Sequence, residues 1–151
     1  MKTFENVSEL SNMVGQEVAV SDWIPVTQEQ VDQFAQATGD HQWIHVDVER
    51  ARAGPFGAPI AHGFLTLSLL PKFMANAMEI RNTRMGVNYG LNKVRFTSPV
   101  PVGSRLRGRM KLLACEPIAG DGVQMTWQVT VEREGSDKPA CVAESLTRRY
   151  A

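Results

Sequence analysis

The chain contains only two cysteines and has no excess of charge of either sign. Its sixteen Lys and Arg residues balance sixteen Asp and Glu residues, so no overall field favours a nucleic acid or a membrane surface as partner. No apolar run reaches the roughly 18 residues that a bilayer span needs. The sequence has no internal repeat and no low-complexity segment. These absences exclude several classes of protein and leave an ordinary soluble globular protein as the expectation.

What is present fits a single domain over residues 1–151. The chain is 43% hydrophobic and 21% charged, and this length can bury a core without disulfides or metals. The beginning of the sequence lacks the basic and then apolar pattern of a secretory signal, so we expect a cytoplasmic protein. Cys115 and Cys141 have neither metal-type nor redox-type spacing, and we expect two reduced thiols in the core.

The first half of the chain has the apolar spacing of helices. We expect helical segments at residues 4–14, 28–38, 48–53 and 63–78. Thr27 and Gln30 form a capping box before the second segment, and Gly39 ends it. The fourth segment is apolar on nearly every side, which predicts a helix wrapped by the rest of the protein. Pro71 should kink this helix or divide it into two pieces.

The second half of the chain alternates apolar and polar residues, as half-buried strands do. We expect strands at residues 17–24, 87–96, 105–112, 123–132 and 140–150. The turn Gly120-Asp121-Gly122 joins two of them into a hairpin. Helices followed by strands around one buried helix predict an α+β fold with an antiparallel sheet.

An acid and a base follow directly after the predicted helix end at Gly39. Asp40 and His45 lie five residues apart in Thr38-Gly39-Asp40-His41-Gln42-Trp43-Ile44-His45, and such a pair can move a proton next to a carbonyl group. In an extended segment their side chains would point to opposite faces, so they converge only if the chain turns. The alternative is that Asp40 is a local turn residue and His45 a hydrogen-bonded core histidine.

Metal binding is a second interpretation of the same stretch. His41 and His45 have the i, i+4 spacing of metal ligands, with Asp47 and His62 nearby, but that spacing requires a helix. Because Trp43 and Ile44 are poor formers of a helix interior and come soon after the Gly39 stop, we expect residues 40–47 to be non-helical and predict no metal.

His62 and Gly63 stand at the start of the apolar helix. A helix N-terminus presents unpaired N–H groups, and a glycine lets a ligand oxygen approach without a Cβ in the way. The Gly63 N–H could therefore bind a thioester oxygen as negative charge develops on it. The alternative is that Gly63 only lets His62 pack and begins the helix.

A basic stripe runs along one predicted strand and its neighbour. It comprises Arg105, Arg107, Arg109, Lys111, Lys93 and Arg95. Such a stripe could contact phosphates, but a solvated face paired with acids such as Glu132 and Glu144 is the more common arrangement.

Taken together, these residues resemble the MaoC-like dehydratase family, the (R)-specific enoyl-CoA hydratases, and within it the branch of nodulation protein N-like proteins. The family motif is an aromatic residue, a spacer, Gly-Asp-x-Asn-Pro-aliphatic-His and then a small residue; Phe34, the stretch 38–45 and Ala51 correspond to it. His62-Gly63, residues 88–96 and Pro99-Val100-Pro101-Val102-Gly103 also look like this family. The resemblance covers residue 17 to the end.

The resemblance implies a hot-dog fold, in which a curved antiparallel sheet wraps around the 63–78 helix. It also implies a homodimer whose sheets join edge to edge, and a trans-2-enoyl thioester of coenzyme A as substrate. Asp40 and His45 would activate the water that adds to this substrate in syn fashion, and the Gly63 N–H would polarise the thioester carbonyl. No metal or other cofactor is implied. The implied substrate-binding residues are Gln42, Trp43, His62, Thr66, Ser68, Asn88, Tyr89 and Gly90.

The sequence departs from the family pattern in two places. Gln42-Trp43 replaces Asn-Pro of the motif, and Pro71 stands where members carry a hydroxyl group, which leaves Thr66 and Ser68 to supply one. An acyl-CoA thioesterase of the same fold and a non-catalytic dimeric acyl-binding module are the alternative functions. The Asp-x4-His spacing favours the hydratase.

Overall fold

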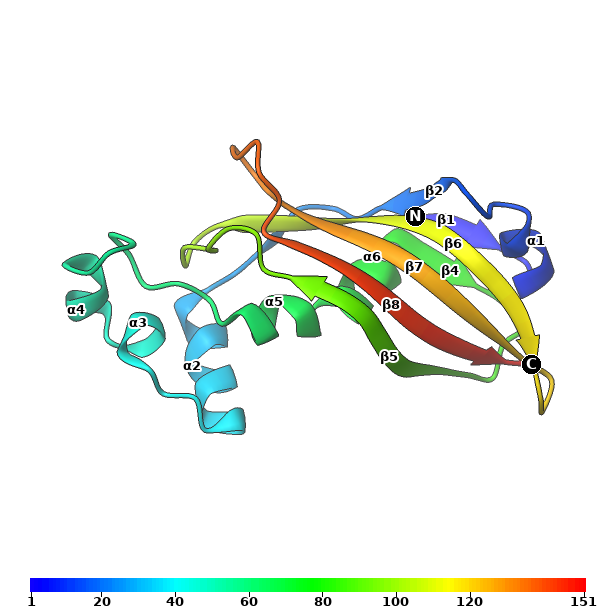
Figure 1. The fold of residues 1–151 in the computed structure, drawn as a ribbon, viewed down its shortest axis with the longest axis horizontal. Helices are drawn as coiled ribbons and strands as arrows, with labels where there is room; N and C mark the ends of the chain where they lie inside the picture. Colours follow the sequence, from blue (N-terminus) through cyan, green and yellow to red (C-terminus); the bar gives the residue numbers. More distant parts are fainter.

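A curved antiparallel sheet forms the body of the protein, and a helix crosses its inner face (Figure 1). The computed structural model describes residues 1–151. The strands of this sheet are β2 (Glu17–Val20), β3 (Ile24–Pro25), β5 (Met85–Arg95), β6 (Arg105–Ile118), β7 (Gly122–Arg133) and β8 (Cys141–Tyr150). Their order is β2-β6-β7-β8-β5, and β3 also pairs with β6. The four long strands and the β6–β7 hairpin confirm the predicted hot-dog architecture.

The apolar segment 63–78 forms two consecutive helices, α5 (Gly63–Ser68) and α6 (Leu70–Ala77). They are separated at Leu69, two residues before Pro71, which confirms the predicted division. Phe73 is completely buried against the sheet, whereas Phe64 is 69% exposed. The expectation that the rest of the chain wraps the whole helix was therefore wrong at its beginning, because no element of this chain lies over that side of α5.

The N-terminal segment contains more than the predicted helix 4–14. The elements found are β1 (Lys2–Phe4) and α1 (Val7–Ser11), and β1 pairs with β4 (Met78–Ile80), which follows the central helix. The side chain of Asn6 accepts the Glu9 N–H and thereby starts α1 after the strand. The parallel pairing of β1 with β4 places Phe4 in the core and ends the central helix before Met78. The helix prediction was wrong for residues 4–6, 12–14 and 78. At Phe4 and Met78 the long-range β1–β4 pairing, which leaves no local pattern in the sequence, takes the place of the helix.

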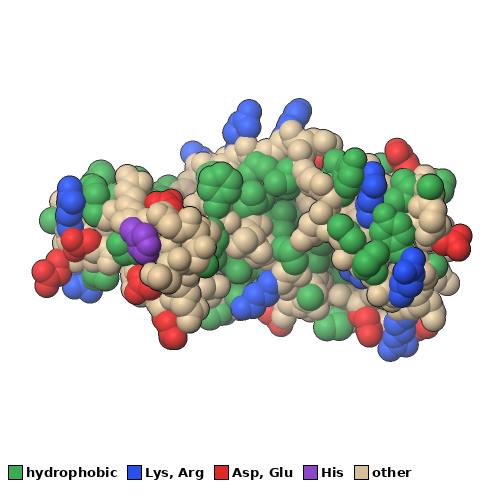
Figure 2. Space-filling view, turned by 90° about the horizontal axis from the view of Figure 1, so that it is seen from below, with side chains coloured by type: hydrophobic (Ala, Val, Ile, Leu, Met, Phe, Trp, Pro, Cys, Tyr) green, Lys and Arg blue, Asp and Glu red, His purple; other side chains and the backbone are tan.

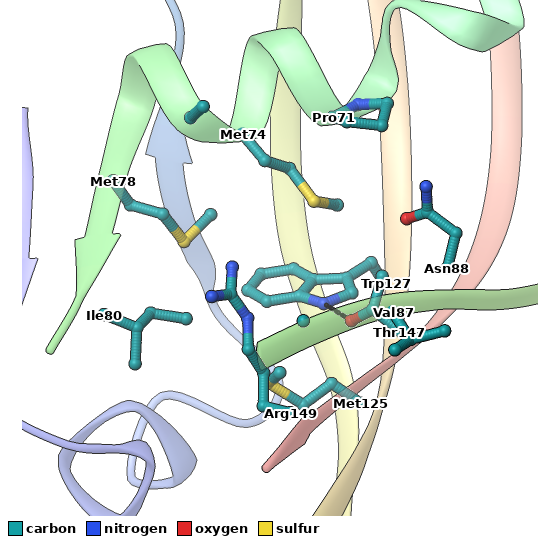
Figure 3. A pocket seen from close by; sticks show the side chains of 12 residues that line it. Pro71, Met74, Met78, Ile80, Val87, Asn88, Met125, Trp127, Thr147 and Arg149 are labelled. Atoms are coloured by element: carbon teal, nitrogen blue, oxygen red, sulfur yellow. Dashed lines mark hydrogen bonds between the residues drawn. The ribbon is translucent and has the colours of Figure 1, made fainter. Parts of the chain in front are cut away.

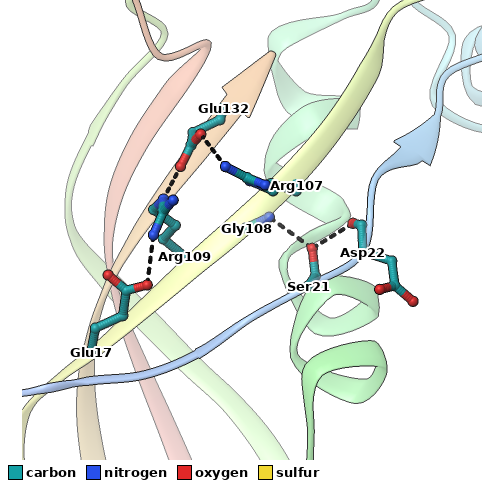
Figure 4. Close-up of polar contacts among 7 residues, drawn as sticks. All are labelled: Glu17, Ser21, Asp22, Arg107, Gly108, Arg109 and Glu132. Atoms are coloured by element: carbon teal, nitrogen blue, oxygen red, sulfur yellow. Dashed lines mark hydrogen bonds and ion pairs between the residues drawn. The ribbon is translucent and has the colours of Figure 1, made fainter. Parts of the chain in front are cut away.

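The predicted strand 17–24 is interrupted between β2 and β3 (Figure 4). The Ser21 hydroxyl accepts the Gly108 N–H at 2.9 Å and donates to the Asp22 carbonyl at 2.9 Å. On the other side of this segment, the Asp22 N–H donates to the Asn76 side chain at 2.7 Å, which connects it to α6. These side-chain bonds replace part of the strand ladder and account for the interruption.

A group of short helices lies at one end of the sheet, on the left in Figure 1. It comprises α2 (Gln28–Thr38), α3 (Trp43–Val46) and α4 (Val48–Arg52). The Thr27 cap and the Gly39 stop of α2 are as predicted. The prediction that residues 40–47 are non-helical was wrong for α3. This short helix is held in place by hydrogen bonds from residues outside its own turn. The Ile60 N–H donates to the Ile44 carbonyl at 3.0 Å.

The outer edge of β5 has no partner strand, and almost every residue of β5 is exposed. The exposed apolar side chains along and beside this edge are Met85, Val87, Tyr89, Leu91, Phe96 and Phe64. Figure 2 shows the corresponding face, where hydrophobic side chains gather across the middle and the right of the view. None of the helices combines the length and the apolar character needed to cross a bilayer.

The basic stripe is paired with acidic side chains at Arg105, Arg107 and Arg109, of which Figure 4 shows the last two. Arg107 lies 3.1 Å from Glu132, which also pairs with Arg109, and Arg105 lies 3.0 Å from Glu134. Glu144 instead accepts a hydrogen bond from Asn92. Three of the six basic residues are thus neutralised by acids of the sheet, whereas Lys93, Arg95 and Lys111 form no ion pair.

The two cysteines are free, as predicted. Cys141 is completely buried, and burial raises the pKa of its thiol to about 11. Cys115 is only partly buried, and burial raises the pKa of this thiol as well. Both side chains are therefore protonated, unreactive thiols at neutral pH.

Candidate active site

Three titratable side chains meet where the helical group contacts the start of the central helix. Asp40, His45 and His62 each offer one oxygen or nitrogen atom within 4.8 Å of the others. Asp40 follows the end of α2, His45 lies in α3, and His62 directly precedes α5. Three separate elements thus bring together residues that the sequence singled out in two distant motifs.

The chain between Asp40 and His45 turns, which the convergence of the two side chains requires. Gly39 adopts a left-handed conformation (φ 83°) that favours glycine and ends α2. A carboxylate oxygen of Asp40 then accepts the Gln42 N–H at 3.3 Å, and α3 begins directly afterwards. The carboxylate remains exposed, so it is accessible to a ligand or a water molecule.

His45 is held as a neutral base. Its ring is buried, and its Nδ1 lies 2.6 Å from the Ile60 carbonyl oxygen. Because a carbonyl can only accept, Nδ1 carries the proton and Nε2 keeps a free lone pair. Burial is the main cause that lowers the pKa of His45 from its usual 6.5, and the neighbouring His62 lowers this pKa further. The opposing effects of the Ile60 hydrogen bond and of Asp40 are smaller than that of burial.

His62 supports both of its neighbours. Its Nε2 donates to the Asp40 backbone carbonyl at 3.0 Å. Its ring stacks on His45, with 3.8 Å between the ring centroids, and its other face approaches Phe34 at 4.8 Å. His62 Nδ1 is buried without a partner. These contacts give His62 a positioning role. The sequence did not reveal this role and suggested substrate binding instead.

Gln28 is a further residue of the site that sequence reasoning missed. Its Nε2 donates to the His45 carbonyl at 2.8 Å and to the Asp32 carboxylate at 2.9 Å. The first turn of α2 is thereby tied to α3 across 17 residues of sequence. The only available signal was the polar residue directly after the Thr27 cap, and it does not indicate what the side chain binds.

Gly63 begins α5, so its N–H has no acceptor within the helix. A hollow of about 340 Å³, here called the Gly63 hollow, lies beside it and is also lined by Thr66 and Phe96. A Cβ on Gly63 would lie only 2.7 Å from the Phe96 ring. The glycine is therefore required by close packing, and Phe96 is the neighbour that requires it.

The predicted residues Gln42 and Trp43 do not face the Gly63 hollow. Gln42 is exposed, and its side chain makes no hydrogen bond in α3. The Trp43 ring packs so closely on Gly54 that a Cβ there would lie 2.9 Å away, and Arg50 covers the ring at 4.3 Å. The structure therefore gives Trp43 a role in shaping the α3–α4 segment, whereas the Gln42 side chain makes no such contact.

The other predicted residues lie farther along the central helix. Asn88, Tyr89 and Gly90 on β5 face Ser68 across a second hollow of about 320 Å³, here called the β5 hollow. The Ser68 hydroxyl donates to the Leu65 carbonyl at 2.7 Å, which leaves its oxygen as an acceptor. The predicted residues thus divide into a cluster around His45 and a row along β5.

The donors of the cluster also bear on metal binding. His45 and His62 each use one ring nitrogen on a backbone carbonyl and retain the other. These two nitrogens and the Asp40 carboxylate belong to the types that hold zinc. His41 is exposed and is not part of this set. The prediction of a site without metal stays a prediction.

Comparisons with known proteins agree on one family. Residues 9–134 match the family described as MaoC like domain. The 3-hydroxyacyl-thioester dehydratase Z of Mycobacterium tuberculosis is 56% identical over 151 residues, which cover all of both chains. Nodulation protein N of Rhizobium leguminosarum bv. viciae is 48% identical over 144 residues, covering 94% of this chain and 89% of that protein.

A solved structure, that of R-hydratase PhaJ1 from Pseudomonas aeruginosa, shares the fold with a TM-score of 0.68 at 24% identity. The match covers 91% of this chain and 81% of that chain. The family match extends over most of the sequence and includes Asp40, His45, His62 and Gly63. The chain belongs to the MaoC-like dehydratase family.

Proposed function

We propose that this hydro-lyase is an (R)-specific enoyl-CoA hydratase/dehydratase. It reversibly adds water in syn fashion to a trans-2-enoyl-CoA and forms an (R)-3-hydroxyacyl-CoA. The observation that carries the proposal is the cluster in which His45, a neutral ring with a free Nε2, lies within 4.8 Å of Asp40 and His62. The unpaired N–H of Gly63 directly follows His62 in the chain.

In the proposed reaction, a water molecule lies between Asp40 and His45. His45 Nε2 takes a proton from this water while its oxygen forms a bond to C3 of the substrate. The C2–C3 π electrons move toward the thioester, so negative charge develops on the carbonyl oxygen. The protonated pair then delivers a proton to C2 from the same face, which gives syn addition and restores the neutral base.

Asp40 and Gly63 stabilise the charges that appear during this step. The Asp40 carboxylate favours the transient imidazolium of His45, as its charge raises the pKa of that ring. The Gly63 N–H donates to the developing oxyanion, and one such donor contributes about 3 kcal/mol to the barrier reduction. The proposed chemistry uses no metal and no redox cofactor, so a chelator should leave the activity unchanged.

The thioester substrate is supported by the relatives. One relative is named a 3-hydroxyacyl-thioester dehydratase and one solved neighbour an R-hydratase. We propose that Thr66 lines the bound thioester beside Gly63 and that the chain continues along Ser68, Asn88, Tyr89 and Gly90. His62 and Trp43 would act indirectly, by shaping the catalytic turn.

We also propose that the protein works as a homodimer joined through β5. An exposed apolar strand of 11 residues with an open edge would otherwise invite uncontrolled association. Pairing of two such edges would continue the sheet and cover Phe64. Sedimentation of the wild type and of Val87→Lys tests this part: a dimer that the added charge dissociates supports it, and a wild-type monomer contradicts it.

The reaction is tested by following the absorbance of the conjugated thioester of crotonyl-CoA and by determining the configuration of the product. Loss of absorbance with formation of (R)-3-hydroxybutyryl-CoA is the expected result. An (S) product contradicts the stereochemistry. Release of free CoA without hydration contradicts the proposal and favours a thioesterase of the same fold.

A further inference from the structure

A third hollow lies at the far end of the central helix, between α6 and the inner faces of β5, β7 and β8 (Figure 3). It has a volume of about 290 Å³ and is here called the Arg149 pocket. Its apolar lining includes Met74, Met78, Ile80, Met125 and Trp127. Pro71 and Asn88 line both this pocket and the β5 hollow. The three hollows therefore follow one another along α5 and α6, starting at Gly63.

One charged side chain enters this pocket, whose other polar side chains are those of Asn88 and Thr147. Cys141, Ala143 and Ser145 of β8 are buried on the inner face of the sheet, and the period of two puts Arg149 on the same face. Figure 3 shows the guanidinium of Arg149 reaching toward α6, between Met78 and Trp127. Gly86 on the neighbouring strand leaves room for it, since a Cβ there would lie 3.2 Å from the guanidinium carbon.

Arg149 has no partner, whereas most other arginines of the sheet have one; Arg133 of β7 is also unpaired. Arg105, Arg107 and Arg109 pair with glutamates, and Arg148 donates to Gln124 at 3.0 Å. Arg149 forms neither an ion pair nor a hydrogen bond, and no acidic residue lines its pocket. Burial lowers the pKa of this guanidinium, and no carboxylate opposes the effect.

A partly desolvated cation without a counterion is unfavourable, and a bound anion relieves the cost. The planar guanidinium matches a carboxylate, with which it forms two parallel hydrogen bonds. The apolar walls, in turn, fit a hydrocarbon chain that leads to this carboxylate. At a helical rise of about 1.5 Å per residue, Met74 lies roughly 16 Å along the helix from Gly63, so only a long chain reaches the pocket.

We propose that the Arg149 pocket receives the far end of a long acyl chain and that Arg149 binds a carboxylate carried on that end. The inference rests on the proposed function, because the thioester end of the same chain would lie at Gly63. It assigns a substrate class, enoyl-CoA thioesters with a terminal carboxylate, and makes Arg149 the residue that selects them over chains that end in a methyl group.

The test compares two long substrates, trans-2-dodecenoyl-CoA and the same thioester with a terminal carboxylate, on the wild type and on Arg149→Met. Methionine keeps an unbranched chain of similar reach and removes the charge. We expect kcat/KM for the carboxylate substrate to fall by about tenfold to a hundredfold, as loss of a charged hydrogen-bond partner implies. Activity on the methyl-ended substrate should stay the same or increase.

A second variant keeps the charge. Gly86→Ala would place a Cβ 3.2 Å from the guanidinium carbon, which then has to shift by a few tenths of an ångström. We therefore expect a smaller loss of preference for the carboxylate substrate than in Arg149→Met. Equal kcat/KM of the wild type for both substrates, or an Arg149→Met effect of the same size on both, overturns the inference while the hydratase proposal stands. Arg149-dependent inhibition by dodecanoate would assign the carboxylate to a free fatty acid and would also overturn the terminal-carboxylate substrate.

Failure of the hydratase proposal is recognised separately, because no enoyl-CoA would then be hydrated. In that case, calorimetric binding of dodecanedioate decides the inference. Binding to the wild type but not to Arg149→Met supports a carboxylate site at Arg149, and equal or absent binding to both overturns it.

Discussion

Replacing His62 with Phe should separate the positioning role of this ring from its contribution to folding. A phenyl ring can still stack on His45 but cannot donate to the Asp40 carbonyl, as His62 Nε2 does at 3.0 Å. Loss of such a hydrogen bond costs about 1 kcal/mol of unfolding free energy. The same change removes the buried, unpartnered Nδ1, whose burial costs about 1–3 kcal/mol. The lost hydrogen bond and the removed unpaired nitrogen have opposite effects on the unfolding free energy. We therefore expect His62→Phe to be about as stable as the wild type or more stable.

Activity should respond differently from stability. Without the hydrogen bond to its carbonyl, Asp40 is no longer held against His45, and a displacement of about 1 Å in an active site can cost about a hundredfold in rate. Hydration of crotonyl-CoA and thermal unfolding, measured on the same samples, check this. His62→Gln is the control, because its amide can donate in place of Nε2 and should recover part of the activity. Full activity of His62→Phe, or equal defects in both variants, would refute the positioning role.

Three further predictions concern pH, the helix start and the sheet. Burial lowers the pKa of His45 from 6.5 in the folded protein, so the unfolded chain binds a proton at this histidine at a higher pH than the folded chain does. Both kcat/KM and the unfolding free energy should therefore fall only as the pH drops below 6.5. Measuring each quantity as a function of pH checks this. Gly63→Ala should lower kcat/KM by roughly tenfold to a hundredfold because its methyl group meets Phe96, and adding Phe96→Leu should restore part of it. Ser21→Ala, which leaves the Gly108 N–H without its acceptor, should cost about 1–3 kcal/mol in denaturant unfolding without changing the rate per folded molecule.

Local signals in the sequence were sufficient for much of the fold. The Thr27 cap and the Gly39 stop fix α2 within a few residues, and the period of two fixes the long strands. The break near Pro71 follows from the missing N–H of proline. These features depend on neighbouring residues alone, which is why a single sequence was enough to predict them.

Features that depend on distant contacts were not predictable. α3 forms where a non-helical segment was expected, because Ile60 and Gln28 bind its carbonyl groups from outside the segment. The role of His62 depends on the carbonyl of Asp40, 22 residues earlier. Spacing alone indicated which chemistry Asp40 and His45 could perform, but not which side chains hold them in place.

The central claim, that Asp40 and His45 perform the hydration together, is tested most directly by the rate of crotonyl-CoA hydration in four variants. Asp40→Asn and His45→Asn remove the acid and the base, and the asparagine amide at position 45 can still donate to the Ile60 carbonyl. Asp47→Asn and His41→Ala are the matched controls nearby. We predict losses of about a hundredfold to ten-thousandfold for the first pair and rates close to the wild type for the controls. Near-normal hydration by Asp40→Asn or His45→Asn, with the fold intact by circular dichroism, would contradict the account.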